Sequence, residues 1–471
     1  MARRPILTLL FVCAVVTTAT ASPRSDPTTG RAVFTGATTA SPTAITLNPA
    51  ALGIGKRDEL YAAISALLDQ LGIDRKSIDV STNTLVDAGH VSDTPFGAGG
   101  QLAVVWHPGA RAALGLDVRL PPPELFPNDP ALRYHTLGNR QRNYVASAGT
   151  SLKIASVFYF GFGLSLDVTR LHLHYARDTA LDPGRGDCDG VPCGFENPAA
   201  SEEYDVNVRS RYFSTENLKL NIGVLVRLGP DRWLGVAYHN TPGFGIQTQL
   251  DGTMEITRAP RDGGGVLNGS STVYVSYPAN VDADFTARVL RDLDLRIGGR
   301  WEDLSRMQAY DVRGYGAAFR ATTVPEWVER PRGFHDAFAL WAGVEQVELD
   351  KSKRWRFGGR IGIETSALPP DRTAPGTMSP TSFSLDLGAQ LRISPGLRLQ
   401  ASYGAQLFPR VAVDGSEYDP RFATECADNG FDYSSRACTA LREGYAIPTA
   451  AGDYTRIQHA VRIGLIYELD P

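Results

Sequence analysis

Apolar and polar residues alternate along most of the chain after residue 97. Across 383–393 the odd positions are Phe, Leu, Leu, Ala, Leu and Ile, and the even positions include Ser, Asp, Gln and Arg. The same period of two recurs at 355–364, 397–407 and 456–468. Alternation of this kind places apolar side chains on one face of a β-strand and polar side chains on the other. The pattern therefore predicts an all-β protein built from many amphipathic strands.

Two stretches depart from this simple alternation. At 158–168 the even positions are apolar, but Leu171, Leu173 and Tyr175 are apolar at odd positions, with His172 and His174 between them. A β-bulge near residue 169 or 170 would explain the change of phase. The second stretch is 58–75, where five aliphatic residues recur at helical spacing: Leu60, Ile64, Leu67, Leu68 and Leu71.

The connections between strands alternate strictly between short turns and long polar loops. The turns lie at 108–110, 154–156, 229–232, 291–293, 350–353 and 394–396, and the loops at 76–96, 121–139, 177–203, 259–269, 315–335, 366–379 and 414–453. A soluble sandwich also alternates, but this loop asymmetry is typical of transmembrane barrels. We predict an antiparallel transmembrane β-barrel of about fourteen strands, an even number. That count requires 58–75 to be a strand, despite its helical spacing.

The N-terminus has the features of a signal peptide. Arg3 and Arg4 precede a short apolar run at 6–16, and Ala19-Thr20-Ala21 forms a cleavage site before Ser22. Elsewhere, no run of about eighteen apolar residues indicates a transmembrane helix. The net charge of −4 argues against a nucleic-acid partner. We divide the chain into a signal peptide at 1–21, an N-terminal segment at 22–57 and the barrel at 58–471.

The small, neutral stretch 38–53 cannot fold alone, because it offers little apolar surface to bury. Read alone, it is either a disordered leader or a plug, also called a hatch, that packs inside the barrel lumen. Because about fourteen alternating strands follow it, we predict that 22–57 forms an N-terminal plug in the lumen. It contains Asn48, Pro49, Ala50, Ala51 and Leu52.

Several short motifs, in this order, resemble those of the FadL/TodX/OmpP1 family of outer-membrane transporters for hydrophobic compounds. They are Asn48-Pro49-Ala50-Ala51-Leu52, the run 234–242 (LGVAYHNTP), Ser276-Tyr277-Pro278-Ala279, the run 369–373 (PPDRT) and Gly452-Asp453-Tyr454. The resemblance covers roughly residues 30 to 471. It implies a monomer without a cofactor, in the outer membrane of a Gram-negative bacterium, in contact with outer-membrane lipids.

The same resemblance implies that the protein takes up hydrophobic small molecules, with long-chain fatty acids as the default ligand and aromatic or alkane hydrocarbons as an alternative. It also implies a gate at residues 48–52 and a lateral exit through the barrel wall. Gly115 before Pro121-Pro122-Pro123 marks a place where the wall is weakened, because Gly and Pro disturb strand pairing.

The loop 121–139 carries candidates for a surface that receives the ligand: Leu125, Phe126 and Leu132. The alternative is that they pack within the loop. Lumenal arginines could meet a carboxylate head group, but we expect them to be solvated or ion-paired with lumenal acids. These arginines are Arg296, Arg300, Arg356, Arg360, Arg392, Arg398 and Arg462.

Four cysteines remain after signal-peptide cleavage. The simplest of three pairings joins Cys188 to Cys193 and Cys426 to Cys438, since exported proteins face an oxidising compartment. We expect no metal site, because no His lies close to either pair. An outer-membrane lipid hydrolase would have His172 and His174 as its best candidates, but no Ser is placed beside them, so we expect no catalysis. A structural or adhesive barrel is a further alternative.

Overall fold

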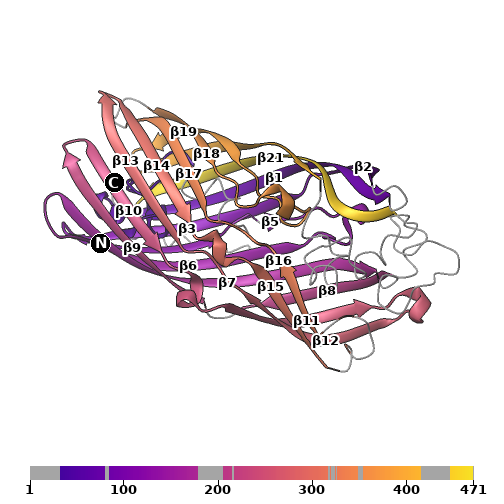
Figure 1. The fold of residues 1–471 in the computed structure, drawn as a ribbon. Coiled ribbons are helices and arrows are strands. Elements are labelled where there is room, and N and C mark those ends of the chain that lie inside the picture. The colour runs from indigo at the N-terminus through magenta and orange to yellow at the C-terminus, as the bar shows by residue number, and fades with distance from the viewer. Residues whose placement is uncertain are drawn as a thin grey trace.

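A computed structural model describes the chain at residues 32–79, 84–122, 124–178, 205–214, 217–316, 319, 324, 326–347, 354–414 and 446–469. The strands form one closed antiparallel barrel with fourteen transmembrane strands (Figure 1). Strand β1 (Glu59–Asp79) pairs along its length with β21 (Ala446–Glu468), which closes the barrel. The predicted fold class is confirmed.

Some transmembrane strands are continuous and others are built from two segments. The other continuous ones are β6 (Arg140–Lys153), β7 (Phe158–Asp178), β18 (Trp355–Glu364), β19 (Ser382–Ser394) and β20 (Leu397–Val413). Each composite strand consists of two segments that follow each other end to end along the chain. These are β2 (Thr84–Asp93) and β3 (Phe96–Gly109), β4 (Ala112–Leu120) and β5 (Glu124–Leu125), β8 (Asp205–Phe213) and β9 (Asn217–Gly229), β10 (Arg232–His239) and β11 (Thr248–Thr257), β12 (Val266–Val275) and β13 (Asn280–Leu290), β14 (Leu293–Glu302) and β15 (Ala309–Tyr315), and β16 (Trp327–Pro331) and β17 (Ala337–Gln346). We call the end of the barrel that carries the short turns, such as 229–232 and 394–396, the turn end. The end that carries the long loops, such as 121–139 and 366–379, is the loop end.

Residues 58–75 are a strand, as the strand count required. In β1 the apolar residues change faces part-way along: Ile64 points outward and is 67% exposed, whereas Leu67 and Leu71 point inward and are buried. Outward apolar residues near the turn end and inward ones near the loop end together imitate a helical spacing. The local pattern is therefore the product of two environments along one strand.

The same explanation replaces the β-bulge predicted in β7, which was wrong. The pairing of β7 with β6 shows no register shift. On the other side the register changes by one residue between Asp167↔Asn217 and Arg170↔Phe213, where the neighbouring strand passes from β9 to β8, so the irregularity does not lie in β7. Phe162, Leu164 and Leu166 face outward and are exposed, whereas Leu171 and Leu173 face inward and are buried. The strand stays in phase, and the apolar residues move from the outside to the inside between 166 and 171.

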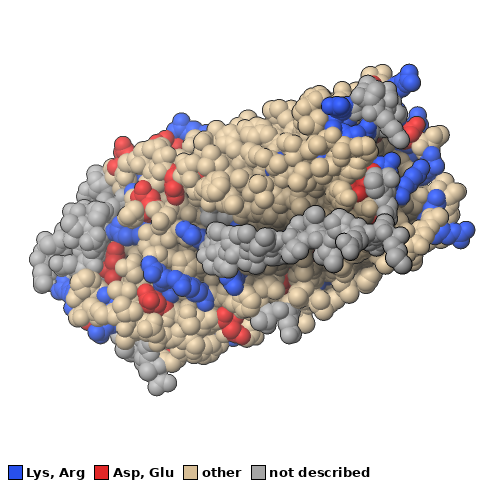
Figure 2. Space-filling model, turned by 180° about the vertical axis from the view of Figure 1, so that it is seen from behind, with Lys and Arg blue, Asp and Glu red and all other residues tan. Residues whose placement is uncertain are grey.

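The outer surface of the barrel is apolar around its middle. Figure 2 shows charged side chains gathered toward the two ends of the molecule, with uncharged residues between them. Exposed apolar residues occur on strands all round the wall, among them Leu116, Leu164, Leu234, Ile297, Leu340, Ile361, Leu385 and Ile463. An outward apolar band of this kind is what a lipid environment requires. No helix among the described residues is long and apolar enough to cross a membrane.

Five consecutive transmembrane strands are interrupted before the loop end. Their outer segments, β8, β11, β12, β15 and β16, form a panel that continues the wall and extends toward the lower right in Figure 1. The inner face of the panel carries a hydrophobic core that includes Val208, Leu250, Ile256 and Val273. The panel therefore packs like a soluble sheet rather than like the lipid-facing wall.

Candidate functional site

The segment from Ala32 to Gly55, which we call the lumenal segment, lies against the inward faces of the strands. It contains two short 3-10 helices, η1 (Pro42–Thr46) and η2 (Pro49–Ile54), which contact wall strands from β1 to β10. Each helix begins with Pro after a capping residue, because Pro lacks the N–H that would otherwise stay unpaired. Ser41 Oγ accepts from Thr43 N at 3.2 Å, and Asn48 Oδ1 accepts from Ala50 N at 3.0 Å.

Asn48 is the polar centre of the lumenal segment and is fully buried. Its Nδ2 donates to Ala37 O at 2.7 Å and to Val224 O at 3.1 Å. One side chain therefore ties together the two halves of the segment and joins them to β9. A second link comes from the wall, where Ser151 Oγ donates to Ala50 O at 2.8 Å.

Two inward-facing glycines allow this close approach. A Cβ at Gly161 in β7 would overlap the backbone of Ala50, and a Cβ at Gly223 in β9 would overlap Asn48 Oδ1. Around them, Ile45 and Leu52 pack against Val105, Tyr159 and Leu225 of the wall. The wall and the segment are thus complementary in shape at residues 45–52, which include the positions 48–52 where the resemblance implies a gate.

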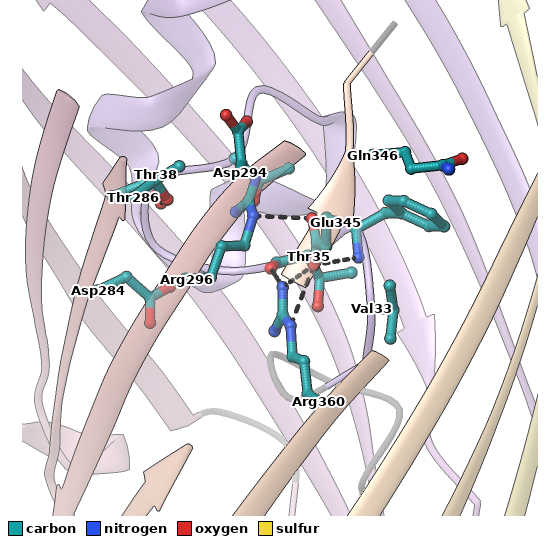
Figure 3. Close-up of polar contacts among 12 residues, drawn as sticks. Val33, Thr35, Thr38, Asp284, Thr286, Asp294, Arg296, Glu345, Gln346 and Arg360 are labelled. Carbon is teal, nitrogen blue, oxygen red and sulfur yellow. Dashed lines mark hydrogen bonds and ion pairs between the residues drawn. The ribbon is translucent and has the colours of Figure 1, made fainter. Parts of the chain in front are cut away.

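The first part of the lumenal segment is held by a buried charge cluster (Figure 3). Glu345 of β17, only 1% exposed at its side chain, accepts from Phe34 N at 2.9 Å and pairs with Arg296 of β14 at 2.7 Å. Arg360 of β18 donates to the same carboxylate at 3.0 Å and also to Thr35 O. The carboxylate therefore fixes both the segment and the two arginines.

Further contacts continue along the segment. Arg296 donates to Thr39 Oγ1 at 2.6 Å, and Thr38 shares a hydrogen bond of 2.6 Å with Thr286 of β13. The backbone N–H of Ala37 donates to Asp284. Side chains from four adjacent transmembrane strands, which contain β13, β14, β17 and β18, thus hold 34–39.

Most of the lumenal arginines predicted from the sequence are ion-paired or hydrogen-bonded. Arg300 pairs with Asp282 at 2.7 Å, Arg398 pairs with Glu59 and Glu468, and Arg462 donates to Gln101. Arg356 donates to Gln390 at 3.0 Å. The acids that take part are mainly Glu345, Asp282 and Glu59, which the sequence reading did not single out.

The wall is interrupted between β4 and β5. Strand β4 ends at Leu120, and the chain next pairs at Glu124, with β6. Gly115 was the wrong position for a weakness, because it pairs with both Val105 and Gly149 and contacts Ile45. The interruption lies at the prolines instead.

We call this interruption the wall gap. A small cavity of about 10 Å³ lies beside it. Its lining includes Gln101 and Arg462 from the inward face of the wall and Ile64 and Gly100 from the outward face. A cavity of this size holds about one water molecule. The cavity is therefore a narrow opening that is bordered by both the inward and the outward face of the wall.

Arg142 of β6 spans the wall gap. Its side chain, which starts on the outward face of β6, donates to the backbone oxygen of Ala98 in β3. Strands β3 and β6 are separated by β4 elsewhere in the barrel. A guanidinium thus takes the place of strand pairing at the interruption.

A larger cavity, about 50 Å³, lies near the loop end. Its lining combines apolar groups such as Leu71, Phe126, Phe334, Met378 and Phe408 with charged groups such as Asp69, Arg332 and Arg456. This volume holds about four water molecules, so a larger ligand would require the loops to move.

The three residues predicted to receive a ligand separate in the structure. Phe126 lines the loop-end cavity. Leu132 is 2% exposed and packs in a core with Ile73, Val91 and Tyr454, as the alternative proposed. Leu125 ends β5, and its side chain is not described.

The remaining candidates from the sequence are two histidines and four cysteines. His172 and His174 alternate with buried Leu171 and Leu173 and therefore face outward. The cysteines at 188, 193, 426 and 438 lie outside the described residues. Within the described part of the chain, no group of three or more His, Cys, Asp or Glu side chains could hold a metal.

No family model matches the sequence, and no curated protein matches it. Among solved structures, the chain is similar to a Pseudomonas aeruginosa FadL homologue, with a TM-score of 0.73, 16% identity and coverage of 96% of this chain and 99% of that chain. It is also similar to the CymD monoaromatic hydrocarbon channel (TM-score 0.60, 15% identity, 91% and 93% covered). A third similar structure is the Ralstonia pickettii toluene transporter TbuX (TM-score 0.59, 16% identity, 93% and 97% covered).

At these identities the similarity concerns the fold. The chain has the barrel fold of the FadL homologue and of the TbuX and CymD channels, as the sequence predicted.

Proposed function

We propose that this protein lies in the outer membrane of a Gram-negative bacterium and takes up hydrophobic molecules through its wall rather than through a central pore. The observation that carries the proposal is the wall gap, where one cavity is lined by residues of both faces of the barrel. The lumenal segment acts as the gate, and no chemical reaction takes place.

The physical reason for a lateral exit is the cost of water contact. Each methylene gains about 0.8 kcal/mol on leaving water, so a water-filled pore would hold an apolar molecule poorly. The buried lumenal segment fills the turn end, and the wall gap opens onto outward apolar residues such as Ile64 and Leu120. A molecule that leaves through the gap passes directly into lipid.

Long-chain fatty acids are the first substrate class, because of the sequence resemblance. The charges of the loop-end cavity favour a second class, uncharged aromatic or alkane hydrocarbons. Arg456 donates through its Nε to Asp69 at 2.9 Å and through its Nη1 to Met378 O at 3.1 Å, and Arg332 lies 3.7 Å from Glu124. A carboxylate would have to compete with these acids. Two of the similar structures are named as a monoaromatic hydrocarbon channel and a toluene transporter.

Uptake of labelled oleate and labelled toluene into a strain that lacks the gene, with and without a plasmid copy, tests the proposal. We expect the plasmid to restore uptake of at least one of them. Gly100→Phe, which places a large side chain at the outward side of the wall gap, should reduce that uptake severalfold. The matched control is Gly359→Phe, an outward position on β18 where a Cβ meets only ordinary contacts. Equal uptake by the two variants would exclude the lateral route.

Deleting 38–53 tests the gate separately. We expect a folded barrel with altered ligand release and increased ion leakage. Unchanged leakage and uptake would mean that the segment is only a leader.

A further inference from the structure

Four arginines form a cluster on the outward face of β6, β7 and β8, which we call the basic patch: Arg140, Arg170, Arg209 and Arg211. All four are exposed. In the strand register His172 of β7 lies opposite Arg140 on one side and Arg211 on the other. Directly opposed residues of antiparallel strands share a face, with Cβ atoms about 5 Å apart. The register therefore gathers the four guanidiniums on one small area.

Few acids lie beside the patch within the described part of these strands. Glu255 of β11 lies opposite Arg209, and Asp251 lies opposite Phe213, where Asp251 accepts from Thr272 at 2.9 Å. Among the described residues, no member of the patch forms an ion pair. Counting only residues that the structure describes, four guanidiniums face two carboxylates, which gives a net positive charge.

His172 lies among the arginines of the patch, because the register places it directly between Arg140 and Arg211. On β7 it follows Arg170, and Val168 is the last outward apolar residue before that arginine. The patch therefore begins where the outward apolar residues of β7 end.

The patch stands directly above lipid-facing apolar residues. Leu164 and Leu166 of β7 and Leu218 of β9 are exposed below it. Between the two zones, Arg170 lies over the rings of Tyr144 at 5.4 Å and of Phe213 at 5.5 Å. The surface therefore offers cations above, aromatic rings at the boundary and aliphatic side chains beneath.

We propose that the basic patch binds the phosphate groups of a phosphorylated glycolipid of the outer leaflet, of the lipid A type, whose acyl chains lie on Leu164 and Leu166. Guanidinium suits this ligand, because its planar fork can donate two hydrogen bonds to one phosphate. The proposal rests on the outer-membrane location proposed above, but it needs neither the gate nor the wall gap.

Native mass spectrometry of the full-length protein in detergent tests it, with diphosphoryl lipid A as the probe. Arg140→Gln with Arg211→Gln should weaken binding about tenfold or more. The matched control, Arg232→Gln with Arg291→Gln, removes two exposed arginines at the turn end and should leave binding unchanged. Heat-dependent gel mobility checks that each barrel is folded.

The probes separate the possible sources of affinity. Fully dephosphorylated lipid A should bind at least tenfold more weakly than the diphosphoryl form, and millimolar inorganic phosphate should not displace it. Equal binding of the two lipid forms, or equal affinity in the wild type and the patch variant, would overturn the proposal. Because this assay involves no uptake, a failure of oleate and toluene uptake would leave a positive lipid result standing.

Discussion

Replacing Gly161 with Ala should release the lumenal segment while leaving the barrel intact. The new methyl group would point inward from β7 and overlap the backbone of Ala50. Backbone atoms cannot rotate away as the end of a side chain can. The segment must therefore move, whereas Ala is compatible with the strand itself.

The magnitude follows from the cost of overpacking. Inserting a methyl group into a close-packed contact costs about 1–3 kcal/mol. Since about 1.4 kcal/mol corresponds to a factor of ten, the ratio of seated to released segment should fall about 5- to 140-fold. If the segment is seated most of the time in the wild type, a fivefold fall in this ratio already raises the population of open barrels about fivefold.

Two measurements report the release. Single-channel conductance in planar bilayers should show more frequent openings in Gly161→Ala than in the wild type. A thiol reagent should label Ala51→Cys, a position that is fully buried, faster in the Gly161→Ala background than in the wild-type background. The control is Gly163→Ala on the same strand and face, where a Cβ would lie 3.4 Å from Ala148 O and no atom of the segment is close. If both alanine variants behave like the wild type, shape complementarity does not hold the segment.

Two further outcomes are expected. Asn48→Leu leaves Ala37 O and Val224 O without their donor, at about 1–3 kcal/mol for each buried group, so conductance should rise while heat-dependent gel mobility stays normal. Ile256→Ala should cost the panel about 2–5 kcal/mol and speed its cleavage by trypsin, whereas Thr253→Ala on the outward face should not.

The strands could be predicted because each half of a lipid-facing strand alternates with a period of two. The pattern misled wherever a strand leaves the lipid and enters the panel or the loop-end core. In β7 the change from Leu166 outward to Leu171 inward looked like a bulge, and in β1 a similar change looked like a helix. Alternation records which face is apolar, but not whether lipid or protein makes it so. Only the pairing of neighbouring strands separates the two cases.

Residues 48–52 were singled out through a motif, but the groups that hold them were not. Glu345 is an ordinary inward acid in the sequence of β17, and its role arises because Arg296 and Arg360 come from the strands on either side. Gly161 is likewise one of several glycines in β7. It does not tolerate a larger side chain, and the reason is the position of Ala50. Contacts between different strands, or between a strand and the lumenal segment, leave no local signal in the sequence.

The lumenal segment and the wall gap share one part of the wall. Ile45 contacts Gly115 of β4, and β4 is the strand that ends at the gap five residues later. A segment that moves away from β4 therefore removes an inner support from the strand beside Gln101 and Arg462, which line the gap. On this geometry, release of the segment and widening of the gap are one motion rather than two. Conductance and uptake should then change together in Gly161→Ala, and uptake alone should change in Gly100→Phe.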